Sequence, residues 1–344
     1  MGRFIVYGAT GTVGRPLTEI LLRRGNTVVA PMRTAHGQLP RPTMHTEVVD
    51  LADFEALRRL SDGADAAFVL VGSNPDQVAV ECRYIDAAAA AGVPRIVKLS
   101  APDLPGQPPM LVAGWHRQVE RHLVATGLEH ASIQPMAFHQ NWLRNTTTIQ
   151  RFNMIAGSAG DAVRNYVDAA DVADVAANLL ETHADLPAIV PVAGPHVYSY
   201  AQVAALLSEV IGRSIRYKDM DPQAHHRMLV KRARMPEWLA DHVVELDTLA
   251  RSISEQPSND IPRLLGRPAR TLSDFLTTSA DAFDQPPWHH FLTNRRRRTG
   301  PGHRPKNPAN TPHGTKESGR LADPLDERVV SRFARSQTRP QNER

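Results

Sequence analysis

The chain has 344 residues, of which 42% are hydrophobic and 22% are charged, as expected for a globular protein of one large or two modest domains. Its one cysteine, Cys82, excludes an internal disulfide and predicts no metal site, and no apolar run reaches the roughly 20 residues of a membrane helix, so we expect a cytoplasmic protein without a membrane partner. Residues 295–344 hold 13 of the 40 basic and 5 of the 36 acidic side chains, which leaves a slightly acidic body without a basic face for nucleic acid.

Residues 1–135 alternate short apolar runs with longer amphipathic ones, a pattern typical of βαβ units around a parallel sheet. We expect strands at 4–7, 26–30, 46–49, 66–71, 95–99 and 131–134, with helices at 13–24, 54–60, 77–91 and 110–126. This order predicts an α/β fold with a doubly wound parallel sheet of the Rossmann type, formed by residues 1–150.

The pattern changes after Pro135. We expect a helix within 166–180, a strand at 189–192, a helix at 200–211, a strand at 214–217, two helices within 224–249 and a last helix at 271–282. Residues 151–290 are therefore predicted to form a smaller α/β substrate region interleaved with the Rossmann core. Residues 295–344 are rich in Gly, Pro, Arg and Ser and poor in apolar residues, which predicts a disordered basic tail.

The first predicted strand leads directly into a glycine-rich loop at the start of a helix. Gly8 permits a sharp turn, Gly11 lets the backbone approach a pyrophosphate, and Gly14 lets the helix pack closely against the sheet. Free N–H groups and the helix dipole then bind phosphate oxygens. A Gly-rich turn without a ligand shares this spacing, but its position in a first βαβ unit favours a dinucleotide site. The cofactor-binding loop is Gly8-Ala9-Thr10-Gly11-Thr12-Val13-Gly14.

Residues after the next three strands are candidates for the rest of the cofactor. Arg33 stands where an acidic residue would select NAD, and because arginine can pair with a 2′-phosphate we expect NADP(H) in preference to NAD(H); a solvated loop arginine is the alternative. Asp50 and Leu51 follow the third strand near the expected adenine, where Asp50 accepts a hydrogen bond from the base or caps the next helix. The backbone after the fourth strand is expected to approach the ribose at Val71-Gly72-Ser73.

Several motifs together resemble the NmrA-like group of atypical short-chain dehydrogenases, which includes NAD(P)H:quinone oxidoreductases and redox-sensing regulators. The resemblance covers approximately residues 3–283. It rests on the glycine loop followed by Arg15, on Lys98-Leu99-Ser100-Ala101, His116-x-x-x-Glu120, Gln134-Pro135-x-x-Phe138-x-x-Asn141 and Tyr166-Val167-Asp168, and on Asp171-Val172-Ala173. The resemblance implies an NAD(P)-binding Rossmann protein and, in its enzymatic members, an NAD(P)H-dependent oxidoreductase.

The Tyr-x-x-x-Lys pair of ordinary short-chain dehydrogenases is missing, because residues 115–120 read Trp-His-Arg-Gln-Val-Glu. This argues against an alcohol dehydrogenase or a sugar epimerase. Hydride transfer to a quinone needs positioning more than acid catalysis, so the sequence favours reduction of a quinone or another small conjugated carbonyl. The alternative is a non-catalytic regulator that senses NADP(H) and reports to a protein partner. A homodimer is compatible with either hypothesis.

His116 and Ser100 are the candidate catalytic residues. His116 polarises or protonates a substrate oxygen, or His116 and Glu120, four residues further on, form a helix-surface pair or pack structurally. Ser100 follows the fifth strand at the ligand-binding end of the sheet, where it contacts the nicotinamide ribose or the substrate, or caps a turn.

The segment after the sixth strand supplies the remaining candidates. The resemblance implies that Pro135 and Asn141 flank the nicotinamide and that Phe138 and Trp115 are apolar walls for a flat acceptor. Either aromatic side chain could equally belong to the ordinary core.

Overall fold

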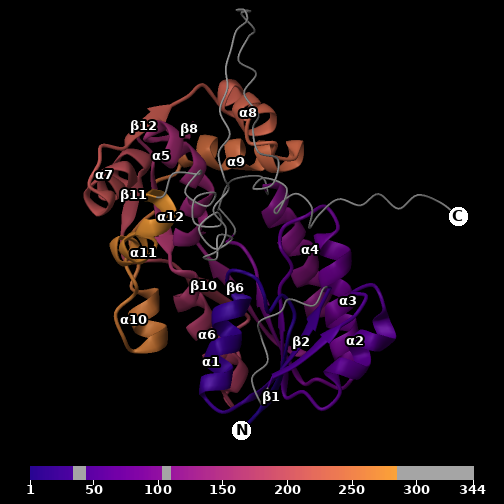
Figure 1. The fold of residues 1–344 in the computed structure, drawn as a ribbon. Coiled ribbons are helices and arrows are strands. Elements are labelled where there is room, and N and C mark those ends of the chain that lie inside the picture. Colours follow the sequence, from indigo (N-terminus) through magenta and orange to yellow (C-terminus); the bar gives the residue numbers. More distant parts are fainter. Residues whose placement is uncertain (34–43, 103–109, 285–344) are drawn as a thin grey trace, which may run out of the picture.

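The structure is a computed structural model that describes residues 1–33, 44–102 and 110–284, so the predicted tail at 295–344 lies outside the described residues (Figure 1). Figure 1 shows two parts. The main-sheet region, in the lower half of the view, is the large sheet with its covering helices. The small-sheet region, in the upper half, comprises residues 137–167, 197–250 and 272–284.

Seven strands form the main sheet in the order β10-β6-β5-β4-β1-β2-β3, and every neighbouring pair is parallel. This confirms the predicted doubly wound parallel sheet. The chain crosses from β3 back to β4 on the other side of β1, and ligands of such sheets bind at the carboxyl ends of the strands around this crossover point. The strands are β1 (Arg3–Val6), β2 (Thr27–Met32), β3 (Met44–Val48), β4 (Ala66–Val69), β5 (Arg95–Leu99), β6 (Glu129–Pro135) and β10 (Ile189–Val192).

Helices cover both faces of the sheet, which explains why its central strands β1, β2, β4 and β5 are mostly apolar on both sides. Along β1, Phe4 and Val6 pack toward one layer, while Ile5 and the adjacent Tyr7 pack toward the other. The first layer contains α1 (Gly14–Arg23) and α6 (Ala169–Glu181), and the second contains α2 (Phe54–Ser61), α3 (Gln77–Ala90) and α4 (Leu111–Ala125).

The small-sheet region contains one three-stranded sheet, β11-β9-β7, and one two-stranded sheet, β12-β8. Its core includes Trp142, Tyr166, Leu207, Leu272 and Phe283. The strands are β7 (Ala137–Phe138), β8 (Met154–Gly157), β9 (Val163–Val167), β11 (Val197–Ser199) and β12 (Arg216–Asp219). The helices are the 3-10 helix η1 (His139–Asn145), α5 (Thr146–Phe152), α7 (Tyr200–Ile211), α8 (Pro222–Lys231), α9 (Glu237–Ala250), α11 (Leu272–Thr278) and α12 (Ala280–Asp284).

Capping residues explain several helix boundaries in the second half of the chain. Asp168 accepts a hydrogen bond from the amide of Ala170, so α6 begins only after it and the expected helical residue Tyr166 lies in β9 instead. Ser199 and Gln202 form a capping box that starts α7 at the predicted residue. The short α10 (Asp260–Leu265), which the sequence did not predict, packs against α6 and β10.

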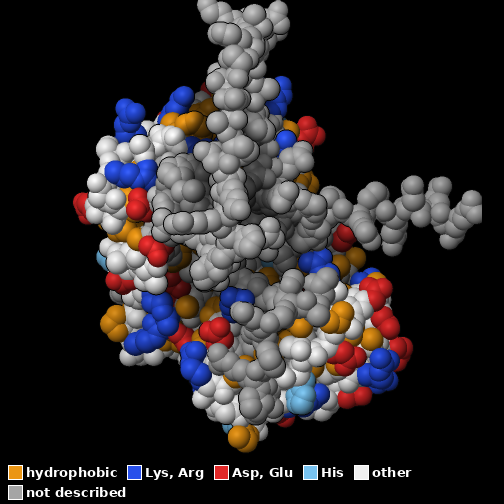
Figure 2. Space-filling view, in the orientation of Figure 1, with side chains coloured by type: hydrophobic (Ala, Val, Ile, Leu, Met, Phe, Trp, Pro, Cys, Tyr) orange, Lys and Arg blue, Asp and Glu red, His pale blue; other side chains and the backbone are white. Residues whose placement is uncertain are grey.

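The surface of the described chain carries mixed charge. On the face seen in Figure 2, basic and acidic side chains are interspersed over both regions, and no continuous basic area is visible among the described residues on that side. None of the described helices has the length and apolar character that a membrane span requires.

Candidate active site and its buried lysine

The glycine loop follows β1 at the carboxyl edge of the main sheet. Gly8 has φ +81°, and a Cβ there would lie 2.6 Å from the carbonyl oxygen of Leu70. A Cβ at Gly14 would lie 2.0 Å from the carbonyl oxygen of Gly8, so only glycine lets α1 approach the loop this closely. Gly11 is exposed and donates its amide to the Gly8 carbonyl oxygen at 2.9 Å, which closes the turn.

The amino end of α1 presents backbone N–H groups that have no acceptor among the described residues. No side chain caps α1 at Val13, and within the described residues the amides of Thr12 and Val13 have no acceptor. Thr10, Gly11 and Thr12 are exposed. A loop that needs glycine at two positions and ends in unpaired amides fits a dinucleotide's pyrophosphate.

The candidates for the adenosine half stand beside this loop in the sheet. Arg33 is exposed at the end of β2, which pairs with β1. Asp50 accepts the amide of Ala52 at 2.9 Å in a turn after β3, whereas the cap of α2 is Asp53. The capping alternative for Asp50 is therefore wrong. Leu51 is half-buried against the core beneath α2 and α3.

The backbone after β4 is only partly available to a ligand. The amide of Val71 donates to Glu81 Oε1 at 3.1 Å, so this N–H already has an acceptor. Gly72 is exposed, and its carbonyl oxygen accepts from Asn74 at 2.6 Å. Ser73 is half-buried in the same loop.

His116 does not lie on the helix surface. It is 7% exposed, and its Nδ1 lies 3.0 Å from Lys98 Nζ and 3.1 Å from Gln77 Nε2. Glu120 instead accepts a hydrogen bond from Gln134 at 3.3 Å. The interpretation of His116 and Glu120 as a surface pair is therefore wrong.

Lys98 and Glu81 form an ion pair that solvent does not reach. Both residues have 0% exposure, and Lys98 Nζ lies 2.7 Å from Glu81 Oε2. Lys98 Nζ also donates to the Leu99 carbonyl oxygen at 2.7 Å. Lysine and glutamate are almost never buried completely unless they are paired, so this cluster beside His116 is a marked departure from an ordinary core.

Burial and charge set the protonation of this cluster. The pKa of His116 lies well below its ordinary value, first because burial disfavours the imidazolium and then because of electrostatic repulsion, from Lys98 first and His242 second. Burial raises the pKa of the Glu81 carboxyl, and the attraction to Lys98 opposes that rise. His116 is therefore a neutral imidazole near neutral pH.

Ser100 lies directly after β5 and is buried. Its amide donates to the carbonyl oxygen of Ile133 at 2.7 Å, while its hydroxyl has no partner within the described part of the chain. A turn-capping hydroxyl would accept a backbone amide there, so the capping alternative has no support among these residues. An unpaired buried hydroxyl at this edge of the sheet fits a contact with a ligand.

The substrate candidates lie in different surroundings. The ring of Trp115 on α4 lies 5.5 Å from that of Trp238 on α9, which joins the two regions. Phe138 packs against the core of the main sheet, as the core interpretation expects. Pro135 is buried at the end of β6 opposite β10, and Asn141 is half-buried in η1.

A second buried polar cluster lies in the small-sheet region. Asp247 accepts hydrogen bonds from Ser158 Oγ at 3.2 Å and from Tyr200 at 2.6 Å, and Ser158 Oγ lies 2.9 Å from His225 Nδ1. In a catalytic triad the serine and the aspartate use different ring nitrogens. Here Asp247 is also nearest to Nδ1, at 3.5 Å, and all three triad-type residues are buried, so the cluster holds helices together.

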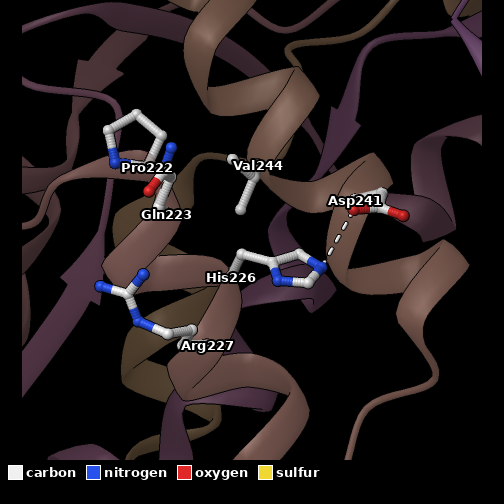
Figure 3. A pocket seen from close by; sticks show the side chains of 6 residues that line it. All are labelled: Pro222, Gln223, His226, Arg227, Asp241 and Val244. Carbon is white, nitrogen blue, oxygen red and sulfur yellow. Dashed lines mark ion pairs between the residues drawn. The ribbon is translucent and has the colours of Figure 1, made fainter.

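A surface pocket of about 390 Å³ lies between α8 and α9 (Figure 3). His226 and Asp241 face one another across it at 2.9 Å. None of the predicted site residues contributes to its lining, which is Pro222, Gln223, His226, Arg227, Asp241 and Val244.

Sequence reasoning missed Lys98 and Glu81 as parts of the candidate site. The available signal was a lysine inside the apolar run Ile96-Val97-Lys98-Leu99, together with Gln77 and Glu81 one turn apart in an otherwise alanine-rich helix. Trp238 and His242 gave no signal, because only the fold brings α9 to α4.

Comparison with known proteins matches this architecture. Residues 8–183 match the family model described as NAD(P)H-binding. An NAD(P)H azoreductase of Xenophilus azovorans is 30% identical over 282 residues, which cover 81% of this chain and 98% of the relative.

Two solved structures share the fold. An NADPH-dependent quinone oxidoreductase of Escherichia coli, complexed with NADPH, has a TM-score of 0.72 and 22% identity over 80% of this chain and 99% of its own. NmrA, a negative transcriptional regulator in complex with NAD, has a TM-score of 0.67 and 16% identity over 85% of this chain and 98% of its own.

The chain belongs to the NAD(P)H-binding family. It is an oxidoreductase of that family and uses a nicotinamide cofactor.

Proposed function

We propose that the chain reduces a small, flat, conjugated acceptor, a quinone or another conjugated carbonyl, with NADPH as the electron donor. The observation that carries the proposal is the neutral, buried His116 on the helix where ordinary short-chain dehydrogenases have Tyr-x-x-x-Lys. A neutral imidazole of low pKa donates a hydrogen bond without being a proton source, which suits an acceptor that needs a hydride and little acid catalysis. The similar proteins named for azo and quinone substrates support this class of acceptor.

The cofactor would lie along the carboxyl edge of the main sheet. The amides of Thr12 and Val13 bind the pyrophosphate oxygens, in the space that Gly8 and Gly14 keep open. Arg33 pairs with the 2′-phosphate, so the protein binds NADP(H) in preference to NAD(H). Bound there, the nicotinamide supplies a hydride. The adenine and ribose contacts come from Asp50, Leu51, Val71, Gly72 and Ser73, and Pro135 flanks the nicotinamide.

Side chains from α4 and η1 would orient the acceptor. Trp115 offers an aromatic face, and Asn141 offers an amide to a polar edge of the acceptor; Phe138 contributes through its exposed part. His116 donates a hydrogen bond to the acceptor oxygen and stabilises the negative charge that develops there. The proton that completes the reduction comes from water, because the imidazolium form of His116 is not populated near neutral pH. Ser100 Oγ completes the polar side of the pocket.

The test is oxidation of NADPH by the full-length protein with a panel of quinones and azo compounds. We expect acceptor-dependent oxidation that His116→Ala lowers about 10²-fold, the usual loss when one donor to a developing oxyanion is removed. His122→Ala is the matched control, because His122 lies on the same helix but pairs with Asp86 at the surface. That variant should keep its full rate.

A non-catalytic regulator would behave differently in the same experiment. It would bind NADPH in a calorimetric titration and show no oxidation above background with any acceptor. The fold shared with NmrA makes this the relevant competing outcome. Such a result would overturn the proposed reaction while leaving cofactor binding intact.

A further inference from the structure

The buried ion pair beside His116 has no evident structural purpose. Lys98 and Glu81 come from β5 and α3 and have 0% exposure, and a buried ion pair commonly stabilises a fold no better than apolar residues of the same volume. The surrounding core is apolar, with Ile96, Val97 and Val119 all buried. A charged pair kept in such a core calls for a functional explanation.

Three acceptor atoms surround the ammonium of Lys98. A lysine ammonium has three N–H groups and no acceptor. The Nζ atom lies 2.7 Å from Glu81 Oε2, 2.7 Å from the Leu99 carbonyl oxygen and 3.0 Å from His116 Nδ1. Glu81 is in turn held by the amide of Val71 at 3.1 Å. The ammonium therefore forms an ion pair with Glu81 and hydrogen bonds with the Leu99 carbonyl oxygen and the imidazole.

These contacts fix the state of the imidazole. Because Lys98 can only donate, His116 Nδ1 must present its lone pair, and the ring proton of a neutral imidazole must then lie on Nε2. Gln77 Nε2 lies between the two ring nitrogens, 3.1 Å from Nδ1 and 3.3 Å from Nε2, so it does not distinguish them and the assignment depends on Lys98. The titratable groups that face the ring from other elements are Lys98 on β5, with Glu81 behind it on α3, and His242 on α9.

We propose that Lys98, held by Glu81, is a positioning residue that keeps His116 in the neutral form with its proton on Nε2, ready to donate a hydrogen bond to the acceptor. The proposal rests on the role given to His116 in the proposed function. In this arrangement Lys98 acts through the imidazole and touches neither substrate nor cofactor. It excludes the other neutral form of the ring, which would turn a lone pair toward the acceptor oxygen and repel it.

The decisive measurement is the protonation of the two ring nitrogens by NMR of the full-length protein with isotope-labelled histidine. The His116 signals are assigned by their loss in His116→Gln. We expect Nδ1 to be unprotonated and Nε2 protonated at neutral pH, with the same pattern persisting below about pH 6, where an ordinary imidazole charges. A proton on Nδ1, or an imidazolium at neutral pH, overturns the proposal without any variant of Lys98.

A paired variant tests whether Lys98 is the cause. Lys98→Met with Glu81→Gln removes the cation and its partner together, so that no unpaired charge is left buried. We expect His116 to populate both neutral forms and its pKa to move toward the ordinary value. His225, buried in the small-sheet region, is the internal control and should keep its signals. An unchanged His116 in the folded variant would contradict the assignment to Lys98.

Kinetics separates this proposal from the proposed function. In the paired variant we expect kcat with a quinone to fall about 10-fold and the acid loss of rate to begin at a higher pH than in the parent protein, while the dissociation constant for NADPH stays unchanged. If His116→Ala leaves NADPH oxidation unaffected, the proposed role of His116 fails, whereas the ring protonation is still decided by NMR. A fall in NADPH affinity instead of kcat would show that Lys98 supports the cofactor site and would overturn its positioning role.

Discussion

His116 in the main-sheet region and His225 in the small-sheet region are each buried in a polar cluster, and the two histidines have neighbours of opposite charge. His116 in the main-sheet region has the Lys98 ammonium at 3.0 Å from Nδ1. His225 in the small-sheet region is linked through Ser158 to the Asp247 carboxylate. Because Ser158 gives its only proton to Asp247, its oxygen must accept from His225, which therefore carries its proton on Nδ1.

The two rings thus hold opposite neutral forms, and the difference separates a structural histidine from a candidate catalytic one. At His225 the inward-facing Nδ1 donates into the core, and hydroxyl, carboxylate and ring satisfy one another. At His116 the buried Lys98 ammonium donates to Nδ1, so the ring carries its own N–H on Nε2. A buried histidine whose N–H is directed by a buried cation is arranged to donate to a ligand.

The largest effect should come from replacing Gly14 in the glycine loop, with Gly212 in the small-sheet region as the control position. In Gly14→Ala the new Cβ would lie 2.0 Å from the Gly8 carbonyl oxygen, so α1 must move and its amides lose their positions. We expect NADPH affinity to fall more than about 10²-fold in calorimetry, a loss of at least roughly 2.7 kcal/mol. Gly212→Ala is the matched change in the small-sheet region, where φ is +67° and no atom lies within 4 Å of the added Cβ.

Gly212→Ala should cost about 1–2 kcal/mol of unfolding free energy, from the left-handed backbone alone, and leave NADPH affinity intact. Chemical denaturation measures the first quantity and calorimetry the second. Normal NADPH binding by Gly14→Ala would mean that the loop does not hold the pyrophosphate.

The second effect is on the pH dependence of stability. The pKa of His116 is lowered well below its ordinary value by burial and by Lys98, whereas at His225 burial lowers the pKa and the Asp247 carboxylate opposes the shift. Below about pH 6.5 the unfolded chain binds a proton at His116 that the folded chain does not, so this histidine makes stability fall as pH falls.

His116→Gln should therefore flatten the stability curve from about pH 6.5 downward by up to roughly 1.4 kcal/mol per pH unit, and His225→Gln should flatten it less. Denaturation at a series of pH values measures both slopes. His242, whose pKa burial and nearby arginines lower to about 4, contributes the same background to both variants. Equal slopes would show that the two buried rings do not differ in their electrostatics.

The same two regions differ in how far the sequence predicted them. The strands of the main sheet were all expected. The central strands β1, β2, β4 and β5 are short apolar runs that are mostly buried, whereas the edge strands β3 and β10 are partly exposed. The strands β7, β8, β9 and β11 were missed. β8 pairs with β12 and β9 with β11, partners far away in the sequence, and both pairs include polar residues. Their pairing depends on the tertiary fold, which local patterns do not reveal.

The residues of the candidate site also differ in how far the sequence predicted them. The glycine loop is local, so its spacing alone indicated the turn and the helix start. The cluster of Lys98, Glu81 and His116 draws one residue from each of three elements, and only folding brings them together. The sequence singled out His116 and left open whether it is catalytic, pairs with Glu120 at the surface or packs structurally. In the structure Glu120 pairs with Gln134 instead.

The smallest expected effect concerns the choice of cofactor. Arg33 follows β2 beside the glycine loop, and its guanidinium would pair with the 2′-phosphate that distinguishes NADPH from NADH. Arg33→Asp replaces this attraction by repulsion of the phosphate and offers an acceptor to a ribose diol. We expect the ratio of NADPH to NADH affinity to fall about 10-fold, equivalent to roughly 1.4 kcal/mol.

Calorimetry with both cofactors measures this ratio. Arg216→Asp, at an exposed position on β12 in the small-sheet region, is the control for the change in net charge and should leave the ratio as it is. Equal affinities for the two cofactors in the parent protein would refute the role of Arg33. A similar shift in both variants would mean that the overall charge of the protein, rather than a contact at Arg33, sets the preference, since a long-range charge effect does not depend on which region carries the substitution.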